Sequence, residues 1–131
     1  MPIHFSIDEA AACVHAQVTG PLQEADPIHF IETLLDHPAY RPGLSVRVDC
    51  DALSVRDFTS VAVGRLAAFT RKVQGRFKLS RVAVVARQPV VFGLVRMYEM
   101  LREPPHEFRV FREHAEADAW LEERASEAPG P

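Results

Sequence analysis

The stretch LSVRVDCDALSVRDFTSVAVGRLAAFTRKV, from Leu44 to Val73, decides the fold of this chain. Apolar and polar residues alternate at its start, which predicts a strand that ends at Asp49. A short loop follows, and Asp57-Phe58-Thr59-Ser60 then opens a segment whose apolar residues recur with helical spacing. A strand that leads through a loop into an amphipathic helix is a building unit of α/β domains.

The rest of the chain shows the same two patterns. Apolar residues recur every two residues in the predicted strands and about every 3.6 residues in the predicted helices. The second predicted strand, 14–18, ends before Gly20-Pro21. This strand follows the first, 3–7, closely enough for the two to form a hairpin. Right-handed crossovers through the helices make the later strands parallel. We therefore predict an α/β fold: a mixed five-stranded sheet with an N-terminal β-hairpin and about four helices on its two faces. The predicted strands are 3–7, 14–18, 44–50, 82–86 and 108–111, and the predicted helices are 26–37, 58–73, 91–101 and 117–121.

Length and composition fit one soluble domain. The chain has 131 residues, of which 47% are hydrophobic and 25% are charged, close to the average for globular proteins. We expect a single domain over residues 1–125 and a flexible C-terminal tail over residues 126–131. The two cysteines, Cys13 and Cys50, are too few for a secreted disulfide scaffold.

The charge pattern excludes some partners. The formal net charge is -3, and no basic run exceeds two adjacent residues, so we expect no nucleic-acid partner. No apolar stretch approaches the roughly 20 residues that cross a bilayer, so we expect no membrane insertion. No signal peptide is visible, and we expect a cytoplasmic protein. Apolar residues on an exposed helix face would favour a homodimer.

Four local sequences lie at the places of the predicted elements: Val18-Thr19-Gly20-Pro21-Leu22, Val46-Arg47-Val48-Asp49, Arg81-Val82-Ala83-Val84-Val85 and Phe92-Gly93-Leu94-Val95-Arg96-Met97-Tyr98-Glu99. These sequences and the order of the elements resemble the SpoIIAA-like (STAS) superfamily over nearly the full length of the chain. The helix at 92–99 resembles one in a branch of small bacterial SpoIIAA-like proteins, which is related to the lipid-binding CRAL-TRIO-like fold. The resemblance implies the SpoIIAA-like fold, and the branch implies an apolar or lipid-like small ligand.

Regulatory members of this superfamily begin the second helix with an Asp-Ser-Ser-Gly motif, and a partner kinase phosphorylates a serine in it to break the complex. The matching stretch here is 57–60, in which Thr59 falls on the phospho-acceptor position. Phe58 and Ser60 replace the neighbouring serine and glycine. The resemblance implies a protein partner that contacts the start of this helix. The candidate surface consists of Ser54, Asp57, Thr59 and Ser60, with Asp49 at the end of the preceding strand.

The residues themselves allow two interpretations of this helix start. Free backbone N–H groups and the positive end of the helix dipole favour a phosphate on Thr59 or Ser60. The alternative is helix capping, in which Asp57, Thr59 or Ser60 accepts a hydrogen bond from the backbone.

Asp49 and Asp51 flank Cys50 at the carboxyl end of a strand, where open α/β sheets bind ligands. Two carboxylates could hold a divalent cation, and this cluster is the one to inspect for an enzyme. The alternative is a solvated loop in which Asp49 caps the backbone or pairs with Arg47. We favour the loop because no third oxygen ligand is evident nearby, and we expect Cys50 to be a small buried hydrophobe. We therefore predict no metal, no cofactor and no catalytic residue.

The third helix carries more methionine and aromatic surface than one buried face needs. We expect Leu94, Met97 and Leu101 to pack in the core, whereas Phe92 and Met100 fit either a core or a pocket. The candidate apolar pocket is therefore Phe92, Met97 and Met100. Two functions follow: a non-enzymatic binding or regulatory module that contacts a protein, or a small carrier of an apolar or lipid-like ligand.

Overall fold

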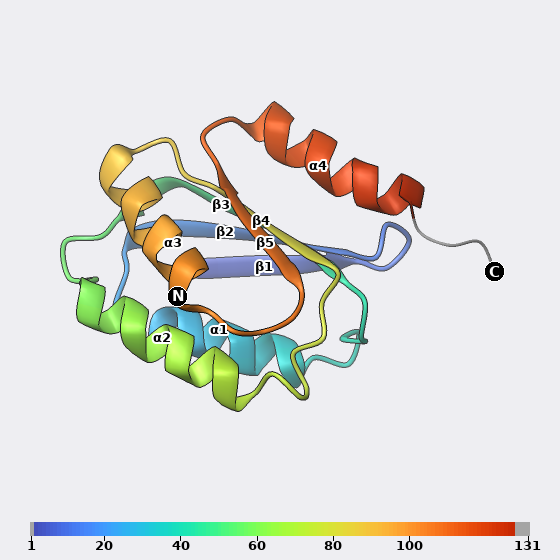
Figure 1. Cartoon of the computed structure of the whole chain (residues 1–131), viewed down its shortest axis with the longest axis horizontal. Coiled ribbons are helices and arrows are strands. Elements are labelled where there is room, and N and C mark those ends of the chain that lie inside the picture. The colour runs from blue at the N-terminus through green and yellow to red at the C-terminus, as the bar shows by residue number, and fades with distance from the viewer. Residues whose placement is uncertain (1, 128–131) are drawn as a thin grey trace.

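The computed structural model describes the chain from Pro2 to Glu127, and its side chains as far as Glu123. The elements alternate as the sequence periods predict, with two strands first and then three further strands separated by helices (Figure 1). Their bounds are β1 Ile3–Asp8, β2 Cys13–Pro21, α1 Asp26–Leu35, β3 Ser45–Ser54, α2 Ser60–Lys72, β4 Arg81–Val85, α3 Pro89–Leu101, β5 Glu107–Phe111 and α4 His114–Glu127.

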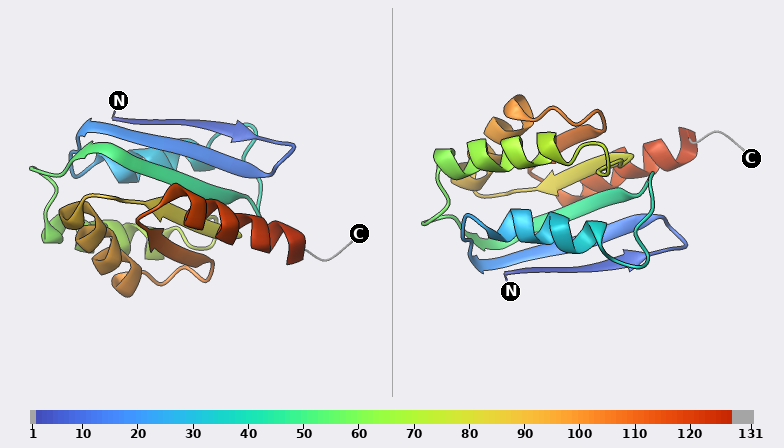
Figure 2. Two further views of the ribbon diagram at one scale, coloured as in Figure 1. Left: turned by 90° about the horizontal axis from the view of Figure 1, so that it is seen from above. Right: turned by 90° about the horizontal axis from the view of Figure 1, so that it is seen from below.

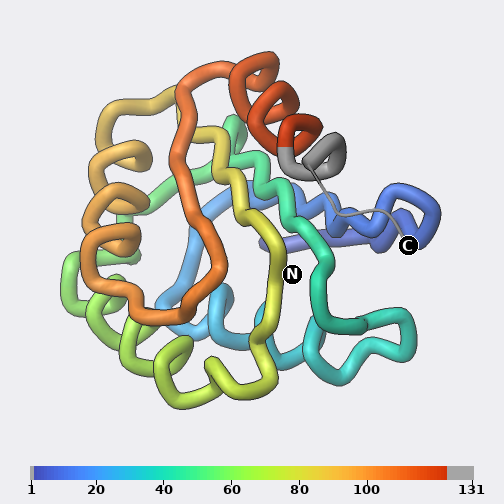
Figure 3. Tube along the Cα trace, turned by 45° about the vertical axis from the view of Figure 1, so that its right-hand side comes forward, coloured from blue at the N-terminus to red at the C-terminus, as the bar shows by residue number. Residues whose placement is uncertain are grey.

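The five strands form one sheet in the order β1-β2-β3-β4-β5. The hairpin of β1 and β2 is antiparallel, whereas β2, β3, β4 and β5 are parallel neighbours. Figure 3 follows the chain from the hairpin through the parallel strands to α4. The predicted mixed five-stranded sheet with an N-terminal hairpin and four helices is thus confirmed.

The helices cover the sheet unequally (Figure 2). The larger core lies between the sheet and α1, α2 and α3, and it includes the fully buried Val14, Leu34, Leu44 and Val63. On the opposite face, α4 packs Ala117 and Trp120 against Ala83 and Val85 of β4. Because α4 packs mainly on β4 and β5, the polar face of β1 and β2 stays exposed.

Strand β3 is longer than predicted. The alternation of apolar residues predicts an end near Asp49, but β3 continues to Ser54. Thr19, Gly20 and Pro21 of β2 pair with residues 52–54 beyond a bulge at which β3 has one residue more than β2, and these pairs hold the extra residues in the sheet. The predicted loop between strand and helix is therefore shorter and begins after Ser54.

Helix α3 faces the core with a different set of side chains from the one predicted. Val91 and Tyr98 are buried, and Leu94 and Val95 pack against the same core. The prediction that Met97 and Leu101 are core residues is wrong, since they are 36% and 47% exposed. Residues at i, i+3, i+4 and i+7 from Val91 form the apolar stripe of this helix, so the methionines fall outside it.

The C-terminal helix extends further than its apolar residues indicate. Helix α4 begins at His114 and continues to Glu127, so it includes the first two residues assigned to the predicted tail. The other four, residues 128–131, lie outside the described part of the chain.

Candidate functional site

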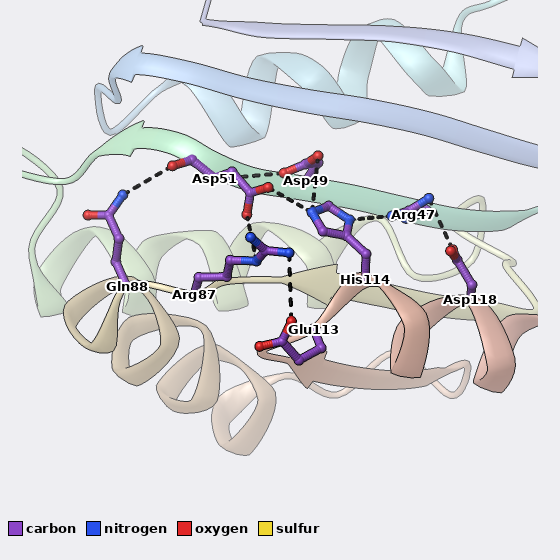
Figure 4. A network of polar contacts seen from close by, with 8 residues as sticks. All are labelled: Arg47, Asp49, Asp51, Arg87, Gln88, Glu113, His114 and Asp118. Atoms are coloured by element: carbon purple, nitrogen blue, oxygen red, sulfur yellow. Dashed lines mark hydrogen bonds and ion pairs between the residues drawn. The ribbon is translucent and has the colours of Figure 1, made fainter.

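A polar network joins the outer face of β3 to the start of α4 (Figure 4). Its centre is His114, the first residue of α4, whose Nε2 lies 2.7 Å from Oδ2 of Asp51 and 3.8 Å from Oδ2 of Asp49. Asp49 also accepts a hydrogen bond from the backbone N–H of Asp51 at 3.0 Å. Strand alternation places both carboxylates on the α4 side of the sheet.

Arg47 completes the network from the other side of the imidazole ring. It donates a hydrogen bond to Nδ1 of His114, and its Nη1 lies 3.0 Å from Oδ1 of Asp118 in α4. An arginine can only donate, so Nδ1 accepts and the ring proton sits on Nε2, which donates to Asp51. This assignment gives both ring nitrogens a partner, and the ring ties β3 to α4.

Two further contacts bring the neighbouring loops to Asp51. Arg87, after β4, has its Nε 3.9 Å from Asp51 Oδ1 and its Nη2 3.6 Å from Glu113. Gln88, which precedes α3, donates to the backbone carbonyl of Asp51 at 3.4 Å and to that of Leu53 at 3.0 Å. The hydrogen bond from His114, assisted by the charge of Arg87, lowers the pKa of Asp51 below its ordinary value. Asp51 is therefore ionised at neutral pH.

The chemistry of this network favours a clamp over a metal centre. The potential ligand atoms of Asp49, Asp51 and His114 lie within 4.8 Å of one another, and His114 is thus a third potential ligand that sequence reasoning missed. A cation on Nε2 would displace the proton that Asp51 accepts and move it to Nδ1, where it would oppose the Arg47 donor. The predicted absence of a metal stays a prediction.

A signal for His114 was present in the sequence. His114 comes three residues after the end of the strand at 108–111, and the carboxyl ends of parallel strands meet at one edge of a sheet. The predicted pairing of Asp49 with Arg47 is not the one found, since Arg47 contacts Asp118 and His114 instead.

Cys50 is separated from the two aspartates that flank it. It is 5% exposed and belongs to the core under the helices, on the opposite face of β3. Burial raises the pKa of its thiol to about 12, so the thiolate that a nucleophile needs is not populated near neutral pH. The prediction of a small buried hydrophobe is confirmed.

The predicted partner surface lies at the start of α2, at the edge of the sheet. Ser54, Asp57, Thr59 and Ser60 are all exposed. Thr59 is the N-cap residue, with extended backbone at φ -102° and ψ 175°, yet within the described residues its side chain makes no hydrogen bond to the helix. The capping alternative is therefore not realised at Thr59. Asp49 lies apart from this group, in the network with His114.

Phe58 differs from its neighbours at this helix start. It is 7% exposed and is part of the main core. The phenyl ring occupies the position at which the resembling motif has a small serine. The aromatic residue thus anchors the loop in the core, while the residues on either side of it remain exposed.

An apolar cavity of about 160 Å³ lies between the sheet and the three helices. Helix α3 contributes Val91, Leu94, Val95 and Tyr98 to its lining, whereas the predicted trio is not part of it. Met100 is 77% exposed and Met97 36%, and Phe92 lies under the guanidinium of Arg112, 4.4 Å from the ring centroid. The predicted helix lines a cavity, but with the face that carries Val91 and Tyr98.

A second groove, of about 410 Å³ and with a more polar lining, lies on the exposed half of the sheet. Its floor includes His4, His15, Gln17 and Asp49 from three adjacent strands. In the register of the hairpin His4 pairs with Gln17, so the two histidines are diagonal neighbours on one face. This groove adjoins the His114 network through Asp49.

Comparison with known proteins identifies the fold. No protein-family model and no curated protein matches the chain. Among solved structures, it is similar to the crystal structure of an uncharacterised protein of the DUF3478 family with a SpoIIAA-like fold, from Shewanella loihica PV-4. The two share 19% identity with a TM-score of 0.54 over 91% of this chain and 93% of the other.

The chain has a SpoIIAA-like fold, and the prediction made from its sequence is confirmed. At this level of identity the similarity establishes the fold alone. Among residues 2–127, no helix has both the length and the apolar character needed to cross a membrane.

Proposed function

We propose that this protein is a non-enzymatic, cytoplasmic, STAS-like module that acts by binding another protein at the start of α2. The observation that carries the proposal is the exposed Thr59, which stands at the helix N-cap without a side-chain bond to the helix. Its hydroxyl is accessible to a partner or to a kinase. The resemblance to regulatory SpoIIAA-like proteins also points to Thr59 as the phospho-acceptor at this contact.

The surroundings of Thr59 combine polar and apolar contact area. Val61, in the first turn of α2, is 59% exposed, and Val90, in the first turn of α3, is exposed to the same degree. Both helices follow parallel strands and so begin at the same edge of the sheet. Exposed apolar side chains beside polar groups are typical of protein contact surfaces.

The proposed switch is electrostatic. The first turn of α2 holds no acidic residue, so the free N–H groups and the helix dipole can stabilise an added phosphate. A phosphate adds about two negative charges next to Asp57, which increases repulsion toward an acidic partner surface and obstructs docking. The free hydroxyl permits docking and the phosphorylated form prevents it.

The test compares the proteins retained by immobilised wild type, Thr59→Ala and Thr59→Glu from the lysate of the native organism. Thr33→Glu serves as the matched control, because Thr33 is exposed on α1 and receives the same substitution. We expect one partner to be retained by wild type, Thr59→Ala and Thr33→Glu, and lost with Thr59→Glu. Equal retention by the two Thr59 variants would reject the switch.

A second candidate function is favoured by the cavity between the sheet and the helices. Its lining is almost entirely apolar, which suits a small carrier of an apolar ligand. Native mass spectrometry of protein purified from its own cells tests this role. An added mass that is lost on denaturation supports a carried ligand, whereas a covalent phosphate mass on Thr59 supports the switch.

A further inference from the structure

Strand β1 is an edge of the sheet. It pairs with β2 along one side only, and it forms the outer margin of the sheet in both views of Figure 2. An edge strand presents a row of backbone donors and acceptors on which another strand can pair. Edge strands are therefore commonly protected by charged side chains, by a proline or by a bulge.

One hydrogen bond fixes the direction of the backbone groups of β1. The N–H of Thr19 donates to the carbonyl of Pro2 at 2.8 Å, so these two residues are a hydrogen-bonded pair of the antiparallel ladder. Hydrogen-bonded pairs alternate with non-hydrogen-bonded ones, and the even-numbered residues of β1 therefore direct their N–H and C=O groups toward β2. Ile3, Phe5 and Ile7 direct theirs outward, where no described residue pairs with them.

Nothing in the sequence of β1 protects this edge between its ends. From Ile3 to Ile7 the strand contains no lysine, arginine, aspartate, glutamate or proline, and its register with β2 runs without a shift. The other edge strand, β5, carries the exposed side chains of Glu107 and Arg109. The sheet thus has one edge that is protected by charge and one, at β1, that is open to a further strand.

The open edge of β1 is complementary to itself. In an antiparallel pair of two β1 strands that centres on Phe5, Phe5 faces its own copy and Ile3 faces Ile7. This register gives every outward N–H of one strand an outward carbonyl of the other. Paired residues point to the same face of a sheet, so the half-buried Phe5 and Ile7 stay on the helix side in both copies. Asp8 then faces Pro2, which keeps the Asp8 carboxylates of the two copies at opposite ends of the contact.

We propose that two copies of this chain associate through β1, in an antiparallel pair that is centred on Phe5 and joins their sheets into one. Both copies use the same surface, so a two-fold axis relates them and the assembly closes at two chains. The polar groove is lined in part by His4 and Ser6 of β1, so the exposed sheet faces of both copies become one continuous surface. The inference goes beyond the proposed function and depends neither on Thr59 nor on the cavity.

The contact is short, so the association is reversible. A strand of 6 residues is about 20 Å long. Interfaces at the small end of the size range are weak or transient. We therefore expect a monomer at low micromolar concentration and a dimer near millimolar concentration.

Exchange of backbone amides with water, measured by NMR on the untagged full chain, tests the pairing without any substitution. The amides of Ile3, Phe5 and Ile7 face solvent in the monomer and are hydrogen-bonded in the dimer. We expect their exchange to slow by about tenfold between low micromolar and millimolar protein concentration.

The other edge of the sheet supplies an internal control. The N–H of Ala86 donates to the carbonyl of Phe111 at 2.8 Å, so the backbone groups of Phe111 face β4. By alternation, Phe108 and Val110 direct their amides outward from β5. The exchange of these two amides should not change with protein concentration.

Analytical ultracentrifugation of Ile7→Pro and of its matched control Ile7→Ala tests the same contact by substitution. Both variants lose the half-buried isoleucine side chain, but only proline also removes the outward N–H. An edge strand accepts a proline whose missing N–H would face solvent, so the pairing with β2 is kept. We expect Ile7→Ala to dimerise at close to the wild-type concentration and Ile7→Pro to need at least about tenfold more protein.

Each outcome supports or overturns the proposal. A dimer in which the amides of Ile3, Phe5 and Ile7 exchange as fast as in the monomer would show that the copies meet elsewhere. A chain that stays monomeric at millimolar concentration rejects the association, and protection of these amides only by a protein from the lysate assigns the edge to a foreign strand instead. Equal dimerisation of folded Ile7→Pro and Ile7→Ala overturns the role of the edge hydrogen bonds. If Ile7→Pro does not fold, the exchange of the wild-type amides decides.

Discussion

Nε2 of His114 lies 2.7 Å from Oδ2 of Asp51, although 63 positions separate the two residues in the chain. The contact holds the first turn of α4 against the middle of the sheet. Arg47 holds the same turn from the other side through Asp118 and His114. The position of α4 on the face of the sheet is thus fixed at its N-terminus by polar contacts and along its length by Trp120 and Ala117.

Replacing His114 by Ala should loosen α4. We expect a loss of about 1 kcal/mol in unfolding free energy, because both partners are partly solvent-exposed, and faster hydrogen exchange in the first turns of α4 than elsewhere. Glu99→Gln, which disrupts the ion pair with Arg96 within α3, is the control and should change little. Because the pKa of Asp51 is lowered, its contribution is present above the ordinary aspartate pKa and is lost as the pH falls through the folded value. Exchange in α4 that stays as slow as in wild type would show that the clamp is not needed.

The buried His106 should make the protein acid-sensitive. Its pKa is lowered from 6.5 to about 4, so between these values the unfolded chain binds a proton that the folded chain does not. Stability is then full above pH 6.5 and falls toward pH 4, by at most about 3 kcal/mol from this group. Urea unfolding at several pH values should show that the unfolding free energy of His106→Phe depends less on pH than that of wild type. His29→Gln changes an exposed histidine and should keep the wild-type pH dependence of the unfolding free energy.

The unused N-cap of α2 should be open to stabilisation. Thr59→Ala should cost less than the ~1 kcal/mol typical of a lost cap, because Thr59 makes no cap hydrogen bond among the described residues. Thr59→Asp should raise the unfolding free energy by about 0.5–1 kcal/mol, because a carboxylate both caps the helix and interacts with its dipole. Thermal unfolding of the two variants measures this, and a large loss in Thr59→Ala would mean that the threonine caps the helix in solution.

Filling the cavity should stabilise the protein. Val63 is 1% exposed and lines the cavity, so Val63→Ile places a methyl group in free space and should add about 1 kcal/mol to the unfolding free energy. Val61→Ile is the control on the same helix, at a side chain 59% exposed, and should change nothing measurable. A destabilised Val63→Ile would indicate that the core is closely packed at this point.

The hydroxyl of Tyr98 should contribute to stability through Thr70. Tyr98→Phe removes the hydrogen bond from Tyr98 to Thr70 and should cost about 1 kcal/mol. Met100→Ala, on the exposed side of the same helix, should stay within about 0.5 kcal/mol of wild type. Chemical denaturation compares them directly, and a larger loss for Met100→Ala would point to a contact that covers Met100, such as a second copy of the chain.

Much of the fold could be predicted from local periodicity. The strands near Val14, Val46 and Val82 and the helices that follow them are present, because alternation and helical spacing report which side of an element is buried. The start of α2 was also placed within a few residues. The predictions were wrong at two places. Pairing with β2 sets the end of β3, and α3 carries two apolar stripes of which only one faces the core.

The sequence by itself determined the order of the elements, the mixed sheet and the exposed start of α2, since each depends on residues a few positions apart. Only the tertiary structure decided which partners His114 and His106 have. Their neighbours come from other strands and helices, and short-range spacing does not encode how strands order themselves in a sheet. For the same reason Asp49, predicted at the partner surface, belongs to the network that holds α4.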